Sequence, residues 1–288
     1  MIKTIEEIIP APPAHMVGDG FRVHNFLPGK HDITRMSPFF LIDYGSKIEF
    51  GPSEKQRGVG VHPHRGFETV TLAYYGKVAH HDSWGNSGVI EEGGVQWMTA
   101  GSGVLHKEYH EKEFSKAGGI FQMVQLWVNL PAKHKMTKPA YQGFTRAQLG
   151  KADLPDSAGT VEVVAGEFNG VKGPATTFSP LHLYNIRLKK GAKVNVELPE
   201  KYNTAIIVIE GAVVINDKAA ANDNFVLFRN EGTEIIATAT EDCILLVMSG
   251  EPIKEAIVPY GPFLMNTKEE IMQAYDDFHK GKFGTLED

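Results

Sequence analysis

Short apolar runs separated by glycine-rich and polar breaks make up the first half of the chain. The runs that we interpret as strands between residues 21 and 129 are 39–43, 68–75, 88–90, 95–99 and 120–129. Runs of this length, bounded by turn residues and without a helical period, are typical of strands in a β-barrel or β-sandwich. The first half is therefore predicted to be an all-β unit.

The second half of the chain repeats the same pattern. Its predicted strands are 181–188, 193–198, 204–209, 212–215, 224–228, 233–239 and 243–248. Between the halves, the stretch 131–180 is rich in Lys, Pro and Gly, which mark loops and a domain crossover. We therefore predict two domains, residues 1–139 and 140–288, with the boundary inside the stretch 135–145.

A helical pattern follows near the end of the chain. Asn266 is predicted to cap a helix with Glu269 at its third position, which is the arrangement of a capping box. Ile271, Tyr275 and Phe278 then fall on one face of this helix. We expect one short helix after the second barrel.

Composition narrows the class of protein. The chain has 288 residues, 42% of them hydrophobic and 22% charged, values that are ordinary for a globular protein and enough for two domains. A net charge of -6 without a Lys/Arg cluster argues against direct nucleic-acid binding. Residues 1–13 lack the apolar core of a signal peptide, and no apolar stretch is long enough to span a bilayer. The single cysteine, Cys243, lies in an apolar run and is expected to be buried as a small hydrophobic residue. We expect a cytoplasmic monomer that binds neither nucleic acid nor a membrane.

Histidine is concentrated in the first half of the chain, where ten of the 12 lie. His62 and His64 are two residues apart in an extended stretch, so they point to the same face of a strand, roughly 6.6 Å apart at Cα. His106 and Glu108 repeat this spacing. Neighbouring strands of a barrel could bring the two pairs together as three imidazoles and one carboxylate, a set that suits Fe, Ni, Cu, Mn or Zn.

The residues around these pairs resemble a known family. His-Pro-His-Arg-Gly-Phe-Glu at 62–68, followed by Gly76, resembles the first cupin motif, and Gly-Ser-Gly-Val-Leu-His at 101–106 resembles the second. The runs that closely resemble pirins are 37–43, 62–70, 96–101, 105–108 and 125–131, which together cover most of residues 37–142. The second half is similar to the pirin C-terminal domain more diffusely, through its length and the segment 259–263. This resemblance implies an all-β fold of two tandem cupin barrels, each a double-stranded β-helix or jelly roll.

The pirin resemblance also implies a ligand set for one transition-metal ion per chain. Its members are His62, His64, His106 and Glu108, and the expected ion is Fe(II), with Ni, Cu, Mn or Zn as alternatives. In the general cupin pattern the carboxylate ligand would instead be Glu68. We favour the pirin pattern, which leaves Glu68 as a partner that orients an imidazole.

Three more histidines lie close to the motifs. His80 and His81 precede the turn-like stretch 82–85 and are expected to satisfy backbone groups rather than bind metal. His110 could border the site, but we expect it at a solvent-facing end of its strand. The candidates for an apolar pocket around the metal, about half of which should be ordinary core, are Phe67, Trp97, Met98, Phe121 and Met123.

The second half provides an internal comparison. Counted back from its own glycine, the positions of the two motif histidines and the motif glutamate are occupied by Glu197, Pro199 and Asn203. This barrel has no histidine pair. We therefore predict that it binds no metal and has a structural role.

The pirin resemblance implies flavonol 2,3-dioxygenase activity, in which a flavonol such as quercetin chelates the metal, O2 adds, the heterocyclic ring opens and CO leaves. Glu108 would then act both as a ligand and as the general base that takes the flavonol hydroxyl proton. Two alternatives stay open. One is a metal-dependent, redox-sensitive regulator that binds a protein partner without catalysis, and the other is a metal-binding cupin whose small substrate is not a flavonoid.

Overall fold

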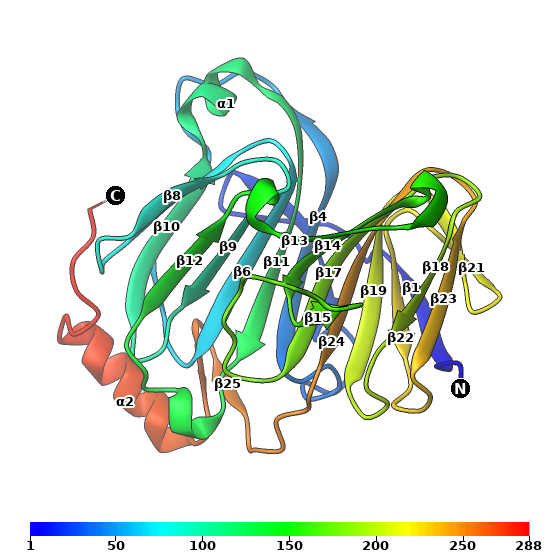
Figure 1. Cartoon of the computed structure of the whole chain (residues 1–288). Coiled ribbons are helices and arrows are strands. Elements are labelled where there is room, and N and C mark those ends of the chain that lie inside the picture. Colours follow the sequence, from blue (N-terminus) through cyan, green and yellow to red (C-terminus); the bar gives the residue numbers. More distant parts are fainter. Residues whose placement is uncertain (288) are drawn as a thin grey trace. The chain divides into compact units, whose positions relative to one another are not determined.

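The structure, a computed structural model, describes residues 1–287 and consists mostly of antiparallel strands (Figure 1). It divides into two compact units, each assembled from separate stretches of the chain. The unit that we call the aliphatic unit comprises Met1–Pro12, Arg35–Pro38 and Gln148–Pro252. The histidine unit comprises Pro13–Thr34, Phe39–Ala147 and the chain from Ile253 onward, and it contains every histidine except His182.

This division differs from the linear division at residues 139 and 140, because both ends of the chain belong to the unit formed by the other half. Strand β1 (Ile5–Pro10) pairs with β22 (Asn224–Phe228) of the aliphatic unit. The segment after Ile253 belongs to the histidine unit, where the backbone N–H of Leu264 donates to the carbonyl of Arg65. Neither pairing follows from the pattern of apolar runs.

The histidine unit is a barrel of two antiparallel sheets. In spatial order, its seven-stranded sheet contains β12 (Ala140–Phe144), β9 (Val95–Thr99), β6 (Phe67–Tyr75), β11 (Gly119–Asn129), β4 (Phe39–Phe50), β3 (Phe21–Leu27) and β2 (His15–Val17). Its four-stranded sheet contains β5 (Gly58–His64), β10 (Val104–His110), β7 (Val78–Asp82) and β8 (Ser87–Ile90). A hairpin of β25 (Val258–Tyr260) and β26 (Phe263–Met265) completes the strands of this unit.

Two α-helices occur in the described residues, both in the histidine unit. Helix α1 (Lys112–Ala117) was not predicted, and the side chain of Glu111 caps it. Helix α2 (Lys268–His279), red in Figure 1, has a capping box formed by Thr267 and Glu270, one residue later than predicted. Its face of Ile271, Tyr275 and Phe278 packs against Phe263 and Met265, which confirms the predicted apolar face. Neither helix is long and apolar enough to cross a membrane.

The aliphatic unit has the same two-sheet design. Its seven-stranded sheet contains β1, β22, β19 (Asn203–Glu210), β24 (Cys243–Gly250), β17 (Leu181–Leu188), β14 (Gly159–Ala165) and β13 (Gly150–Asp153). Its four-stranded sheet contains β18 (Lys193–Glu197), β23 (Glu234–Ala239), β20 (Ala212–Ile215) and β21 (Lys218–Ala221), and a small hairpin contains β15 (Glu167–Phe168) and β16 (Val171–Lys172). One large cluster of apolar side chains fills this unit. Cys243 is buried in that cluster, as predicted, and burial raises the pKa of its thiol to about 11.

Candidate metal centre

Strand β10 carries the centre of the candidate site. Its residues alternate between buried and half-buried, so that His106 and Glu108 face the inside of the barrel and Lys107 and Tyr109 face outward. His106 lies directly opposite His62 of the neighbouring strand β5. Strand pairing therefore brings the third imidazole to the first two, as the spacing predicts.

The three imidazoles form a compact cluster. One ring nitrogen from each of His62, His64 and His106 lies within 4.8 Å of the other two. The ring centroids are 4.8 Å apart for His62 and His64, 4.2 Å for His62 and His106, and 4.8 Å for His64 and His106. Three nitrogen donors this close together are able to share one transition-metal ion.

Hydrogen bonds fix which ring nitrogens face this cluster. Nδ1 of His62 lies 2.8 Å from the carbonyl oxygen of Gly60, and Nδ1 of His64 lies 3.3 Å from that of Pro262. A carbonyl only accepts, so each Nδ1 donates its proton and each Nε2 is left with a free lone pair. Nε2 of His106 is buried and has no hydrogen-bond partner within residues 1–287. A buried polar atom without a partner is costly, and a bound cation would satisfy it, so these residues fit a metal ion.

Burial favours the neutral form of His64 and His106. Burial, reinforced by the neighbouring His62, holds the pKa of His64 well below its usual range. Burial, together with His62 and His64, does the same to the pKa of His106. Neutral imidazole is the form that binds metals, so both rings are in the ligating state over the physiological pH range.

Glu108 is buried beside this cluster and hydrogen-bonds to the opposite sheet. Its carboxylate accepts from Nε2 of Gln125 at 3.1 and 2.9 Å and from the hydroxyl of Thr71 at 3.4 Å. Its oxygen also lies within 4.8 Å of ring nitrogens of His80 and His106. The structure thus contains two overlapping groups of potential ligands, His62–His64–His106 and His80–His106–Glu108, which share His106.

Glu68, the alternative carboxylate, lies elsewhere. It is three residues before Thr71 on β6, so strand alternation puts it on the opposite face from the residue that contacts Glu108. Its carboxylate accepts a hydrogen bond of 2.7 Å from the hydroxyl of Thr99, and burial raises its pKa to about 7. The expectation that Glu68 orients an imidazole is corrected, because its hydrogen-bond partner is a hydroxyl on the outer face of the sheet.

Two of the remaining histidines also differ from expectation. His80 is fully buried, and its Nδ1 lies 2.9 Å from Nε2 of Gln96 and 3.4 Å from Nδ1 of His106, so its partners are side chains rather than backbone groups. His110 is buried rather than solvent-facing. Its Nε2 donates to the carbonyl of Gly20 at 2.8 Å, within a cage of aromatic rings formed by Phe21, Phe50, Phe114 and Phe121.

The aromatic rings next to the imidazoles are Phe67 and Trp127. Their centroids lie 5.0 and 5.1 Å from that of His64, and the two rings stack on each other at 4.2 Å. Phe67 was predicted for such a pocket, whereas Trp127 was missed, although it shares an inward face of β11 with Gln125. The other candidates are buried, but no ring contact joins them to the three clustered imidazoles among the described residues. Met98 packs with Ala100 and Val104, Phe121 and Met123 belong to the cluster around Phe21, and Trp97 pairs with Val70 on the outer face.

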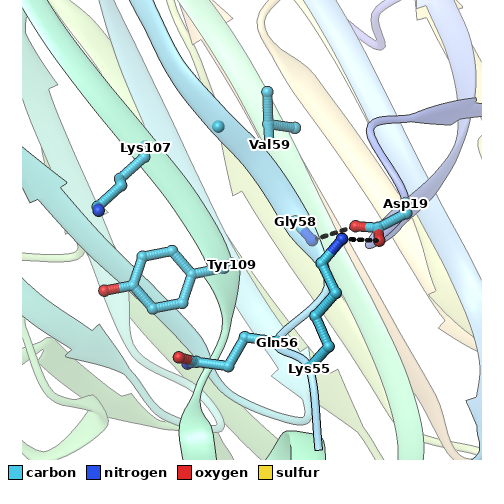
Figure 2. A pocket seen from close by; sticks show the side chains of 8 residues that line it. Asp19, Lys55, Gln56, Gly58, Val59, Lys107 and Tyr109 are labelled. Carbon is cyan, nitrogen blue, oxygen red and sulfur yellow. Dashed lines mark hydrogen bonds and ion pairs between the residues drawn. The ribbon is translucent and has the colours of Figure 1, made fainter. Parts of the chain in front are cut away.

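A groove with a volume of about 660 Å³ lies on the outside of the four-stranded sheet (Figure 2). It is lined by Asp19, Lys55, Gln56, Gly58, Val59, Gly60, Lys107 and Tyr109. None of these residues belongs to the imidazole cluster, although the carbonyl of Gly60 also accepts the proton of His62. Lys107 and Tyr109 therefore provide controls on the same strand as His106 but on its other face.

Two double-sheet barrels in one chain, one of them with a buried group of imidazoles and a carboxylate, define a two-barrel cupin protein. The sequence model of the Pirin family matches residues 20–128, and that of the Pirin C-terminal cupin domain matches residues 183–284. The chain belongs to the pirin family.

Individual relatives agree with this classification. A Pseudomonas aeruginosa protein provisionally named as a quercetin 2,3-dioxygenase is 45% identical over 269 residues, covering 93% of this chain and 94% of its own length. A pirin-like protein of Solanum lycopersicum is 36% identical over 271 residues, covering 93% and 88%. The crystal structure of quercetin 2,3-dioxygenase from Acinetobacter baumannii superimposes with a TM-score of 0.95 at 46% identity over 100% of both chains.

Proposed function

We propose that this protein is a mononuclear metal-dependent dioxygenase that opens the ring of flavonols such as quercetin with O2. The observation that carries the proposal is the cluster of three imidazoles, one of which, His106, is also grouped with the buried carboxylate of Glu108, in a chain that is similar over its whole length to a quercetin 2,3-dioxygenase. The overall reaction balances without a further reductant. The flavonol gains both atoms of O2 and loses one ring carbon with its oxygen as CO.

In this proposal, four residues hold one ion per chain. Three of them, His62, His64 and His106, would bind through Nε2, and Glu108 would bind through one carboxylate oxygen. The ion is Fe(II), with Ni, Cu, Mn and Zn suited to the same donors. When bound, it would act as a Lewis acid on the flavonol oxygens and supply the redox chemistry that O2 requires.

Glu108 would also remove the proton of the flavonol hydroxyl. Gln125 and Thr71 donate hydrogen bonds to its carboxylate and hold it in place, so that an oxygen free of the ion stays within reach of a substrate next to it. A fixed base beside the bound substrate lowers the entropic cost of the proton transfer.

The surroundings suit a flat aromatic substrate. Phe67 and Trp127 form a stacked apolar wall next to His64. His62, Gln125 and Trp127 are half-buried, whereas His64, His106 and Glu108 are buried, so the half-buried residues mark the side from which a substrate would approach. An aromatic ring system placed there would contact the wall and direct its oxygens at the imidazole cluster.

The test is a turnover assay with the intact protein. After anaerobic loading with Fe(II) and metal analysis, we expect O2 uptake and CO release with quercetin. Protein that binds its metal stoichiometrically but consumes no O2 would overturn the dioxygenase and favour the metal-dependent regulator. In that case the metal would have to be the redox-sensitive element, because the one thiol of the chain, Cys243, is buried with a raised pKa.

A further inference from the structure

His80 is a fully buried histidine that the proposed ligand set leaves without a role. It lies on β7 directly opposite Glu108 of β10, and Asp82 lies opposite His106 in the same pairing. Its Nδ1 faces Nδ1 of His106 at 3.4 Å. The ring is therefore in contact with the imidazole that both groups of potential ligands share.

The protons between these two rings can be placed by counting donors. Two Nδ1 atoms that face each other require one proton between them, because two lone pairs repel. Nε2 of Gln96 lies 2.9 Å from Nδ1 of His80 and donates to it, so Nδ1 of His80 is an acceptor and its proton is on Nε2. The proton between the rings then belongs to Nδ1 of His106, so the single lone pair on Nδ1 of His80 is shared by two donors, Gln96 at 2.9 Å and His106 at 3.4 Å. This leaves Nε2 of His106 as a bare lone pair, and it is one of the buried side-chain atoms that have no hydrogen-bond partner in the described part of the chain.

The reverse arrangement is incompatible with a metal-binding His106. If Nδ1 of His80 carried the proton, Nδ1 of His106 would have to accept it. Neutral His106 would then be protonated on Nε2 and have no lone pair for an ion in the cluster. The amide of Gln96 thus selects the tautomer of both rings.

The far side of His80 faces a carboxylate. Nε2 of His80 lies 3.6 Å from Oδ2 of Asp82, which is too far for a hydrogen bond, and this Nε2 has no hydrogen-bond partner among the described residues. Asp82 is itself held by the backbone N–H groups of Trp84 and Asn86, both at 2.9 Å, and by the side-chain amide of Asn86. The ring of Tyr141 stacks on His80 at 5.3 Å, which leaves the imidazole little freedom to rotate.

We infer that His80 is a positioning residue, which, oriented by Gln96, accepts a hydrogen bond from Nδ1 of His106 and so presents Nε2 of His106 to a first-row transition-metal ion. The relay runs from the amide of Gln96 through the imidazoles of His80 and His106 to the metal position. It rests on the proposed function only in requiring that His106 binds the ion. It predicts a role in metal affinity rather than in contact with substrate.

A matched pair of substitutions isolates the acceptor. His80→Phe keeps a ring of similar volume against Tyr141 but has no acceptor for His106. His80→Asn places an amide oxygen close to the position of Nδ1 and keeps the acceptor. His81→Phe, on the exposed face of the same strand, is the control for substitution of a histidine in β7.

The measurement is the affinity of the intact protein for Co(II), obtained by competition with a chelator, together with the visible absorption spectrum of the Co(II) form. We expect His80→Phe to lose roughly 10- to 100-fold in affinity and to shift the spectrum, whereas His80→Asn stays close to the parent protein and His81→Phe is unchanged. The thermal midpoint of the metal-free variants checks the fold. If His80→Phe folds and binds Co(II) with unchanged affinity, or if His80→Asn loses as much as His80→Phe, the inference is overturned.

Failure of this inference can be told apart from failure of the dioxygenase. A parent protein that binds Co(II) tightly but whose Fe(II) form does not oxidise quercetin contradicts the dioxygenase alone. Equal affinities of the two His80 variants contradict the relay alone. A parent protein that binds no Co(II) overturns both, because the ligand set itself would then be wrong.

Discussion

The two barrels of this chain have the same strand order but different interiors. Each combines a seven-stranded with a four-stranded sheet, and β5, β10, β7 and β8 correspond in order to β18, β23, β20 and β21. Along β10 the inward positions hold His106, Glu108 and His110, whereas along β23 they hold Ile235, Ala237 and Ala239. The barrel therefore supplies positions, and the residues at those positions decide whether it has a polar centre or an apolar core.

The same contrast appears in the strands next to these two. His62 and His64 of β5 face the cluster in the histidine unit. In the aliphatic unit, Val194 and Val196 of β18 are buried, while Glu197 is exposed at the end of that strand. Asn203 is buried, and its side-chain amide donates to the carbonyl of Ser37. Both groups of potential ligands lie in the histidine unit because a few inward positions on three strands, β5, β7 and β10, hold histidine or glutamate.

The largest expected effect tests the polar centre itself. His106→Ala should abolish stoichiometric metal binding, because His106 belongs to both groups of potential ligands, while most of the fold remains. Elemental analysis of the purified variant measures this, with Lys107→Ala, on the outer face of the same strand, as the control. One equivalent of metal retained in His106→Ala, or metal that stays with the aliphatic unit, would remove the distinction between the two barrels.

A second experiment compares the two carboxylates of the histidine unit. Glu108→Gln should lower metal affinity by more than about 100-fold, because a ligand is lost. Residues that hydrogen-bond to a ligand typically cost roughly 10- to 100-fold when they are replaced. Glu68 does not contact a ligand, so Glu68→Gln should lower the affinity by less than about tenfold. Competition with a chelator ranks the two variants. A larger loss for Glu68→Gln would mean that the general cupin ligand set applies.

A third experiment uses the pH dependence of stability. The pKa of Glu68 is raised from its ordinary value of 4.5 to about 7 by burial, so the folded protein binds more protons than the unfolded chain between these values. The free energy of unfolding should therefore fall as pH rises from about 4.5 to about 7, by an amount on the order of 3 kcal/mol at full ionisation. Glu68→Gln has no such charge, so it should gain this amount over the parent protein at pH 8 but little at pH 5.

Urea unfolding of both proteins at the two pH values measures this difference. The same difference at pH 5 and at pH 8 would show that the carboxyl group of Glu68 ionises normally in the folded protein. Thr99→Val is a second variant for the same urea-unfolding measurement, because it removes the hydroxyl that donates to the ionised form of Glu68.

The smallest expected effect concerns the apolar barrel. Ile235→Val removes one methylene group from a fully buried side chain of β23 and should cost about 1 kcal/mol of stability. Metal content should stay unchanged, because Ile235 lies in the aliphatic unit. Urea unfolding and metal analysis of the same preparation give both values. A change in metal content would show that this barrel contributes to the site.

Local spacing was sufficient to predict the imidazole cluster. Residues two apart on a strand share a face, and adjacent strands of a barrel bring two such pairs together, so the sequence alone predicts that His62, His64 and His106 lie together. Alternation also puts Glu68 and Thr71 on opposite faces of β6. Which of these faces is inside the barrel depends on the pairing of β6 with distant strands, so the sequence alone could not exclude Glu68 as a ligand.

Long-range contacts account for most of what the sequence did not reveal. Gln96, Gln125 and Trp127 lie on the opposite sheet from the histidines, and no spacing along the chain links them to the site. The cap of α2 was misplaced by one residue because Asn266 and Thr267 can both cap a helix. The side chain of Asn266 donates instead to the carbonyl of Ala256, a partner ten residues away that only the folded chain defines.

The hydrogen bond from His64 to Pro262 joins two residues that are 198 positions apart in the chain. Because a ribosome releases the chain from its N-terminus, all three clustered histidines emerge before the aliphatic barrel is made and well before Pro262 appears. Nδ1 of His64 gains its carbonyl partner only when the last part of the chain folds back into the histidine unit. The order of synthesis thus makes completion of the site a late event, which follows the translation of the whole second barrel.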